Sequence, residues 1–164
     1  MTDIRVAVLT VSDRGSRGER EDLSGLAAQE AVVGMGWTVE ERDIVPDQLE
    51  AIASRLRHYS DRLGLDLILT TGGTGMSPRD VTPEATRQVI EREAPGFVEA
   101  MRAASLNKTP HAMLSRAVSG IRSSTLIINL PGSPKAVKEN LEVVLPALTH
   151  GLEKLRGDES ECAE

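Results

Sequence analysis

A glycine-rich turn follows an apolar run in the middle of the chain. The run Leu67–Thr70 leads directly into Thr71, Gly72, Gly73, Thr74 and Gly75. Glycine lets the backbone approach an anion closely, and consecutive N–H groups in such a turn can form an anion-binding concavity. The threonine hydroxyls add further donors. This segment is therefore a candidate site for a phosphate-bearing ligand.

Two familiar phosphate-binding motifs do not match this turn. The Gly-Lys-Ser/Thr that ends a P-loop is missing after Gly75. Gly73 and Gly75 have the first spacing of the dinucleotide fingerprint, but Pro78 stands where the third glycine would be required. The structural alternative is a tight turn between a strand and a helix. The adjoining threonines and the acidic, proline-bounded loop favour a binding role instead.

Two aspartates lie where they could hold a metal ion against phosphate oxygens. Asp80 follows the glycine turn, two residues before the predicted helix cap Thr82, and Asp47 follows Pro46 at the end of a predicted strand. Mg²⁺ is usually bound by one or two carboxylates together with substrate phosphates. Asp47 and Asp80 are thus candidate catalytic and metal-binding residues for phosphoryl transfer. The structural alternatives are a local turn for Asp80 and a helix cap for Asp47.

Two further loops could contribute to the same site. The turn at Gly132, Ser133 and Pro134 begins a predicted helix, whose N-terminal N–H groups can face an anion or can simply be capped by Ser133. Ser12 and Asp13 follow the first predicted strand, where a surface turn is an equal alternative. Arg14 and Arg79 could supply cations.

The hydrophobic pattern predicts strands that alternate with helices. Strands are expected at residues 4–11, 37–45 and 66–70, and helices at 22–35, from 47, at 82–95, at 97–106 and from 133. Residues 118–121 and 125–130 suggest a hairpin. We therefore predict a three-layer α/β fold, with a mostly parallel sheet, helices on both faces and one antiparallel hairpin. In such sheets ligands bind at the carboxyl ends of the strands, which is where the candidate loops fall.

The composition excludes several other classes of protein. Aromatic residues are 2% of the chain and the formal net charge is −6, so both the stacking platforms and the basic surface of nucleic-acid-binding modules are missing. The single cysteine, Cys162, cannot form an internal disulfide. The first residues lack the features of a signal peptide, and no apolar run approaches the roughly 18 residues of a membrane span. We expect a cytoplasmic protein without membrane contact.

Taken together, the sequence resembles the MogA/MoaB-type molybdopterin adenylyltransferase family of molybdenum cofactor biosynthesis. The resemblance runs over nearly the whole chain and rests on seven blocks in order: LTVSDRGS (9–16), VPD (45–47), LTTGGTG (69–75), RDVTPEA (79–85), PGFVEAMR (95–102), LSRAVSGIR (114–122) and NLPGSPKAV (129–137). It implies a compact α/β domain that assembles as a homotrimer. We expect one domain at residues 1–156 and a disordered acidic tail at 157–164.

The resemblance also implies an activity and a site. Members transfer AMP from ATP to the terminal phosphate of molybdopterin, release pyrophosphate and need Mg²⁺, and their product goes to a molybdate-insertion protein. The family's two functional aspartates match Asp47 and Asp80. Its pterin and phosphate contacts match Thr71–Gly75 and Gly132–Pro134, and a further block at the pocket matches Ser12 and Asp13.

Two other functions stay open on the sequence. A MoaB-like member of the same pathway could bind molybdopterin without catalysis, as a carrier or scaffold. A hydrolase of nucleotides or sugar phosphates could use the same kind of sheet, since a fold alone does not fix a function. Pyrophosphate release that requires both ATP and the pterin separates adenylyl transfer from either alternative.

Overall fold

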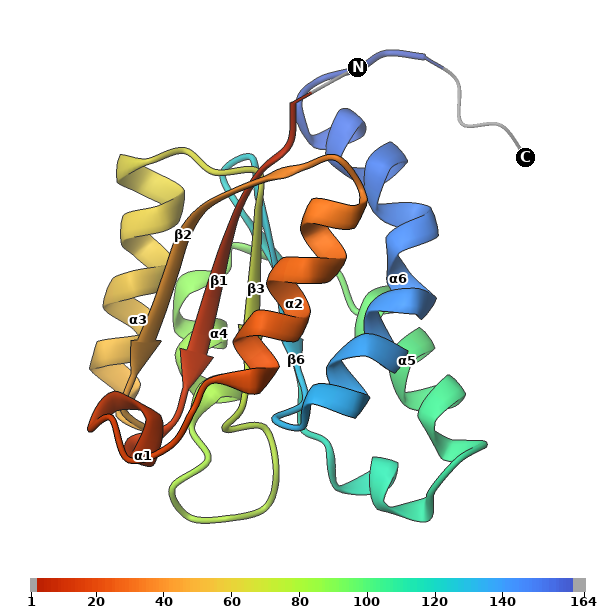
Figure 1. Cartoon of the computed structure of the whole chain (residues 1–164). Coiled ribbons are helices and arrows are strands. Elements are labelled where there is room, and N and C mark those ends of the chain that lie inside the picture. The colour runs from red at the N-terminus through yellow and green to blue at the C-terminus, as the bar shows by residue number, and fades with distance from the viewer. Residues whose placement is uncertain (1–2, 161–164) are drawn as a thin grey trace.

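A six-stranded sheet between two helical layers forms the centre of the molecule (Figure 1). The computed structural model describes residues 3–160. The strands lie in the order β2-β1-β3-β6-β5-β4, and the first four are mutually parallel. Their bounds are β1 Arg5–Val11, β2 Thr38–Val45, β3 Leu67–Thr71, β4 Arg92–Glu93, β5 Ser119–Arg122 and β6 Thr125–Leu130. The hairpin β5–β6 is antiparallel, so the predicted three-layer α/β fold is confirmed.

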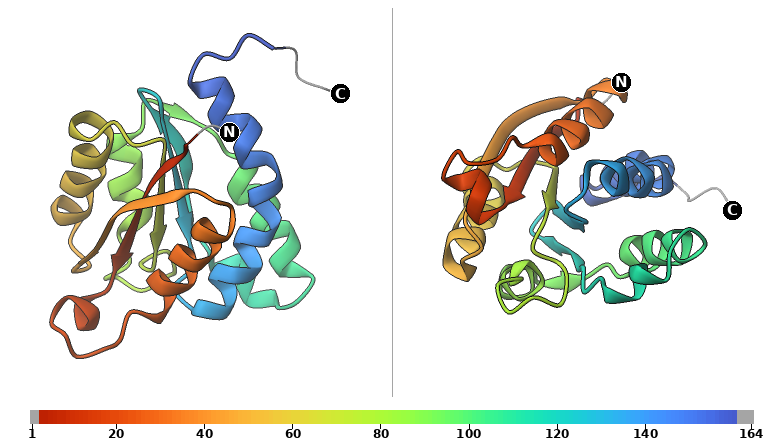
Figure 2. Two further views of the ribbon diagram at one scale, coloured as in Figure 1. Left: turned by 45° about the horizontal axis from the view of Figure 1, so that its top comes forward. Right: turned by 60° about the horizontal axis from the view of Figure 1, so that its bottom comes forward.

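The helices cover both faces of this sheet (Figure 2). One core packs α2, α5 and α6 against one face, and a second core packs α3, α4 and the π-helical turn η1 against the other. The bounds are α1 Asp13–Ser16, α2 Leu23–Gly34, α3 Leu49–Arg57, η1 His58–Arg62, α4 Thr82–Val89, α5 Gly96–Leu106, the 3₁₀ turn η2 Pro110–Leu114 and α6 Pro134–Leu155. Among residues 3–160, none of these helices is both long and apolar enough to cross a membrane.

Strand β1 shows why the sheet needs both layers. Val6 and Val8 belong to the core under α2 and α6, while Ala7 and Leu9 belong to the core under α3 and α4. Side chains alternate between the two faces of a strand, so an uninterrupted apolar run can be buried only where helices cover both sides. This is the pattern that the apolar run at 4–11 predicted.

The chain after α4 differs from the sequence prediction. We expected a helix from Thr82 to Pro95, but α4 ends at Val89 and residues 92–93 form the edge strand β4. Glu91 N–H donates to Ile121 O (2.8 Å) and Ala94 N–H donates to Ser119 O (3.0 Å). The hairpin thus supplies backbone hydrogen-bond partners that the local sequence pattern does not reveal. Pairing with a distant segment determines the structure here, in place of local helix propensity.

All four parallel strands point their carboxyl ends to one edge of the sheet, at the bottom of Figure 1. Strand β2, the next strand along the chain, lies on one side of β1, and β3 lies on the other side. The crevice between β1 and β3 is therefore a topological switch point, the usual ligand position in such sheets. The loops after β1, β2, β3 and β6 all lie at this edge.

Candidate active site

The turn after β3 requires its first two glycines. Gly72 and Gly73 have φ of +95° and +67°, a region that L side chains rarely adopt. A Cβ at Gly72 would lie less than 3.0 Å from Val11 O, and one at Gly73 less than 3.0 Å from Thr82 Oγ1. The turn therefore packs directly against β1 and α4, and only glycine fits at both positions.

Helix α4 and strand β6 hold the start of this turn. Thr82 N–H donates to Gly73 O (3.1 Å), and its hydroxyl donates to Gly72 O (2.9 Å). Thr82 was predicted to cap α4, but it is the first residue of the helix and Val81 precedes it as the cap position. Gly72 N–H donates to Leu130 O (3.3 Å), and the buried Thr71 hydroxyl donates to Pro131 O (2.6 Å). Neither of these donors is free for a ligand.

The remaining N–H groups of the turn are free. Within residues 3–160, the N–H groups of Gly73, Thr74 and Gly75 have no hydrogen-bond acceptor, although Thr74 is buried. Unpaired backbone donors next to a cavity are uncommon in folded proteins and are normally satisfied by water or a ligand. Three successive donors of this kind suit a phosphate group.

Asp47 is locked to Asp13 across the ends of β2 and β1. Asp13 N–H donates to Asp47 Oδ2 (2.9 Å), and Asp47 N–H donates to Asp13 Oδ1 (3.0 Å). The alternative role of Asp47 as a helix cap is wrong, because Gln48 occupies the cap position of α3. The Asp13 carboxylate also accepts two hydrogen bonds at 2.8 Å from Arg79 Nη2. Arg79 is thus paired with Asp13 and holds the acidic loop against α1.

The carboxylates at this edge perturb one another. Burial raises the pKa of the Asp47 carboxyl, the nearby Asp13 and Asp80 carboxylates raise it further, and the hydrogen bond from Asp13 opposes them. By contrast, the Arg79 guanidinium holds the pKa of the Asp13 carboxyl below its usual value. A partly buried carboxylate that faces like charges is a site where a bound cation relieves repulsion.

Asp80 closes a small turn in the loop. Its Oδ2 accepts from Ser77 N–H (3.0 Å), and its own N–H donates to Ser77 O (2.9 Å). The local-turn interpretation of this residue is therefore correct for one carboxylate oxygen. The other oxygen accepts no hydrogen bond within residues 3–160, and Asp80 lines the cavities described next. Asp80 can combine a structural and a binding role.

Two cavities meet at the glycine turn. The first, of about 470 Å³, lies at the strand ends; the second, of about 440 Å³, lies between α5, η2 and the start of α6. Gly73, Asp80 and Gly132 line both. Besides Asp80, the first cavity contains the acidic side chains Glu21, Asp22 and Asp47 and a cation, Arg20. The second combines apolar and polar side chains, among them Met101, Ser105, Lys108, Glu139 and Asn140. We call them the acidic cavity and the mixed cavity.

The structure brings most of the predicted site residues together. The acidic cavity is lined by Ser12, Asp47, Thr71, Gly72, Gly73, Asp80, Gly132, Ser133 and Pro134, and Thr74 and Gly75 line the mixed cavity. Asp13 lines neither cavity, but it contacts Asp47 and Arg79. The Ser133 hydroxyl has the capping role foreseen as its alternative, because it accepts from Ala136 N–H (3.2 Å) at the start of α6. The Ser12 hydroxyl caps the short helix α1, where the sequence had suggested only a surface turn.

Sequence reasoning missed the helical wall of the mixed cavity. Met101, Ser105 and Lys108 recur at helical spacing on and just after α5, and Asn140 interrupts the apolar face of α6. A polar residue on an apolar face was a signal, but nothing local indicated that α5 and α6 border the glycine turn. Asn140 is buried and donates to Ala136 O (2.7 Å), so its amide is oriented.

These residues fit a divalent cation of the Mg²⁺ type. Within the described part of the chain, no three acidic, histidine or cysteine side chains converge on a point. Asp47 and Asp80 both line the acidic cavity, and the Asp80 carboxylate contributes to the raised pKa of the Asp47 carboxyl. Two carboxylates with the remaining positions left for phosphate and water oxygens match how Mg²⁺ is usually bound.

Comparison with known proteins places this chain in a family. Residues 7–150 match the family described as "Probable molybdopterin binding domain". The chain belongs to this family. The molybdopterin adenylyltransferase of Helicobacter pylori (strain J99 / ATCC 700824) is 44% identical over 166 residues, which cover 100% of this chain and 94% of the relative. The enzyme of the same name from Escherichia coli (strain K12) is 43% identical, covering 93% and 81%.

Solved structures of molybdopterin biosynthesis proteins share the fold. The enzyme MoaB from Thermus thermophilus is 54% identical and has a TM-score of 0.89, covering 94% of this chain and 98% of that one. A MogA structure is 37% identical, with a TM-score of 0.87 over 92% and 99% of the two chains. The resemblance to the MogA/MoaB-type family is confirmed.

Proposed function

We propose that this member of the family is a Mg²⁺-dependent molybdopterin adenylyltransferase. It transfers AMP from ATP to the terminal phosphate of molybdopterin and releases pyrophosphate, in molybdenum cofactor biosynthesis. Support comes from relatives of that name at 43% and 44% identity and from the chemistry of the site.

One observation carries the proposal: two cavities meet where free backbone N–H groups and a carboxylate lie together. A transfer between two bound substrates needs two pockets that share the reacting position. We assign the triphosphate of ATP to the acidic cavity, where a metal ion can join it to Asp47 and Asp80. The pterin then occupies the mixed cavity, whose apolar and amide groups suit a flat heterocycle.

The protein's own groups position and neutralise the substrates. The N–H groups of Gly73, Thr74 and Gly75 bind the pterin phosphate at the junction of the cavities. Asp47 and Asp80 would hold Mg²⁺, which supplies charge neutralisation for the phosphates. A phosphate that is already ionised at neutral pH attacks the α-phosphorus of ATP in line, so neither a protein nucleophile nor a strong general base is needed.

The direct test uses purified protein, molybdopterin, ATP and Mg²⁺. We expect adenylylated pterin by mass spectrometry and one pyrophosphate for each molecule formed, both dependent on all three components. Pterin binding without product would indicate a carrier, and phosphate release without pterin would indicate a hydrolase. Either result would refute the proposed reaction.

We also propose that the protein acts in the cytoplasm as a homotrimer that passes its product to a molybdate-insertion protein. These features rest on the resemblance to the family. Light scattering on the purified protein tests the trimer, and a pull-down with the insertion protein tests the contact.

A further inference from the structure

We propose that Arg116 is a positioning residue that holds the second half of the glycine turn and the loop carrying Asp80. This inference rests on the proposed function of the site. Arg116 lies between η2 and β5, outside both the turn and the acidic loop. It lines neither the acidic cavity nor the mixed cavity. Any effect of its side chain on the reaction is therefore expected to be indirect.

Arg116 contacts four points of residues 74–84. Its N–H donates to Thr74 O (2.8 Å), Nε donates to Gly75 O (2.7 Å) and Nη2 donates to Asp80 O (2.8 Å). Nη1 forms an ion pair with Glu84 Oε1 on the first turn of α4. One planar guanidinium thus joins both ends of the loop Gly75–Asp80 to a helix. The fixed fork of an arginine allows this arrangement, and a lysine cannot reproduce it.

The first half of the turn does not depend on Arg116. Thr82 and Leu130 hold Gly72 and Gly73, whereas Arg116 alone among the described side chains holds the carbonyls of Gly75 and Asp80. The Arg79–Asp13 pair is the loop's other side-chain tie, but it holds the Arg79 side chain and does not contact the Asp80 backbone. Loss of Arg116 should therefore release Asp80 while leaving the Gly72–Gly73 backbone in place.

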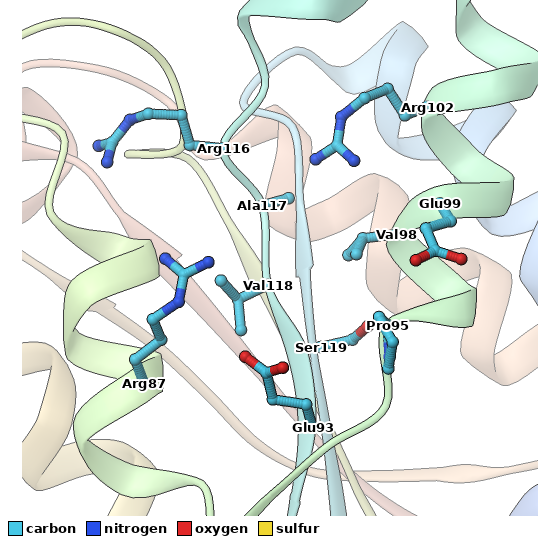
Figure 3. A pocket seen from close by; sticks show the side chains of 10 residues that line it. All are labelled: Arg87, Glu93, Pro95, Val98, Glu99, Arg102, Arg116, Ala117, Val118 and Ser119. Carbon is cyan, nitrogen blue, oxygen red and sulfur yellow. The ribbon is translucent and has the colours of Figure 1, made fainter.

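A third cavity makes a chemical rescue possible. It has a volume of about 430 Å³ and lies between α4, β5 and α5, with Arg116 in its wall (Figure 3). In Figure 3 the Arg116 guanidinium turns away from those of Arg87 and Arg102. The carboxylates of Glu93 and Glu99 and the guanidinium groups of Arg87 and Arg102 also line this cavity, so its opposite charges balance once Arg116 is truncated. Free guanidinium could thus reach the space that a truncated Arg116 leaves.

The experiment compares wild type with Arg116→Ala and Arg116→Lys. For the alanine variant we expect kcat to fall about a hundredfold, the scale of a misplaced catalytic group, and the Mg²⁺ concentration for half-maximal rate to rise. The affinity for molybdopterin should change far less. Guanidinium at low, non-denaturing concentration should restore part of kcat to Arg116→Ala, and should not do so for Arg116→Lys, where the lysine side chain fills the space.

Hydrogen exchange of the amides in residues 76–80 gives a readout that is independent of activity. We expect faster exchange in Arg116→Ala and recovery with guanidinium. The control is Arg122→Ala at the far end of β5, the strand that follows Arg116. Arg122 also binds a carboxylate, Asp61, and a backbone carbonyl, Val89 O. The Arg122→Ala substitution should leave amide exchange in residues 76–80 and the Mg²⁺ dependence of the rate unchanged.

The outcomes separate the two proposals. If wild type makes no adenylylated pterin, the proposed function fails, and the exchange data still decide whether Arg116 holds the loop. If wild type is active but Arg116→Ala keeps normal kcat, Mg²⁺ dependence and loop exchange, the inference is wrong. Arg116→Ala could fail to fold because Glu84 loses its partner. In that case the same measurements of kcat, Mg²⁺ dependence and loop exchange are made on Arg116→Lys, which keeps the positive charge beside Glu84. Wild-type values in Arg116→Lys would then overturn the proposal.

Discussion

At the scale of single residues, the site combines free backbone donors with two carboxylates of different character. Asp47 is braced by Asp13 and has a raised pKa, while Asp80 sits on a loop with one carboxylate oxygen tied to Ser77 N–H. Asp47 is therefore held rigidly, whereas Asp80 can change position with its loop when a ligand binds. Substitutions at the two positions should therefore differ in their effect on stability while both reduce adenylyl transfer.

We expect Asp80→Asn to leave molybdopterin binding largely intact and to lower the rate of adenylyl transfer by about a hundredfold, the usual scale for a key electrostatic group. The amide keeps an oxygen that can accept from Ser77 N–H, so the local turn should survive. A coupled pyrophosphate assay measures the rate, and fluorescence titration measures pterin affinity. A normal rate would remove Asp80 from the mechanism.

Gly73→Val should weaken molybdopterin binding. Its Cβ would collide with Thr82 Oγ1 and fill space beside the free N–H groups, and its φ of +67° is unfavourable for a branched residue. The matched control is Gly34→Ala at the last residue of α2, where a Cβ meets nothing within 4 Å; it should leave molybdopterin binding unchanged. Unchanged affinity in Gly73→Val would place the pterin pocket elsewhere.

Asp47→Asn should make the protein more stable at pH 7. The raised pKa means that the folded state binds more protons than the unfolded chain between the ordinary value of 3.8 and the folded value. The contribution of Asp47 to stability therefore falls as the pH rises through that window. Thermal melts should show the variant's advantage at pH 7 and its loss near pH 3. Asp13→Asn should behave oppositely, because Arg79 lowers the pKa of Asp13.

At the scale of elements, a buried amide joins the strands that carry the site. Asn129 on β6 donates to Thr70 Oγ1 (2.9 Å) on β3 and to Thr86 Oγ1 (3.0 Å) on α4, and it accepts from Val118 N–H (3.0 Å) before β5. It is fully buried. This network fixes α4, whose Thr82 holds the glycine turn, against the sheet.

Asn129→Ala should therefore destabilise the fold as a whole. It leaves the buried Val118 N–H without an acceptor, which costs about 1–3 kcal/mol before the cavity is counted. Urea unfolding measures the difference. Asn107→Ala, at the exposed end of α5, should change stability by less than about 0.5 kcal/mol. Equal effects of the two substitutions would show that the network contributes nothing.

The elements also show what a sequence can reveal. An apolar run, a glycine turn and a helix start are local signals, so β3, the turn and the beginning of α4 were predicted nearly to the residue. Strand β4 depends on pairing with β5, and the mixed cavity depends on α5 and α6 reaching the turn. Both are contacts between distant segments. The position of Asp13 outside both cavities could not be predicted for a similar reason, because Arg79 and Asp47 reach its carboxylate only in the folded chain.

At the scale of the whole molecule, a residue after the last helix connects the end of the chain to its beginning. Arg156 after α6 donates to the Asp66 carboxylate (2.6 and 2.8 Å) at the start of β3 and to Asp3 O (2.6 Å). Past the expected domain end, Gly157 has φ of +91°, and Asp158 N–H donates to Glu153 O (3.1 Å). Gly157 N–H also donates to Lys154 O (3.0 Å). The left-handed glycine and these two hydrogen bonds form a C-terminal cap for the last carbonyls of α6. Residues 161–164 of the expected tail lie outside the described residues.

The cap predicts where the chain can be shortened. A chain that ends at Asp158 should keep wild-type thermal stability and activity, because the ion pair of Lys154 with Asp158 is retained and exposed contacts beyond it contribute little. A chain that ends at Arg156 should melt at a lower temperature, since the Lys154 carbonyl loses the Gly157 N–H and the Glu153 carbonyl keeps only the Arg156 N–H. Its rate per folded molecule should not change, because the cavities lie at the other end of α6. If both chains melted like wild type, the cap would contribute nothing to stability. A loss of activity in the Asp158 chain would instead extend the functional domain into the last six residues.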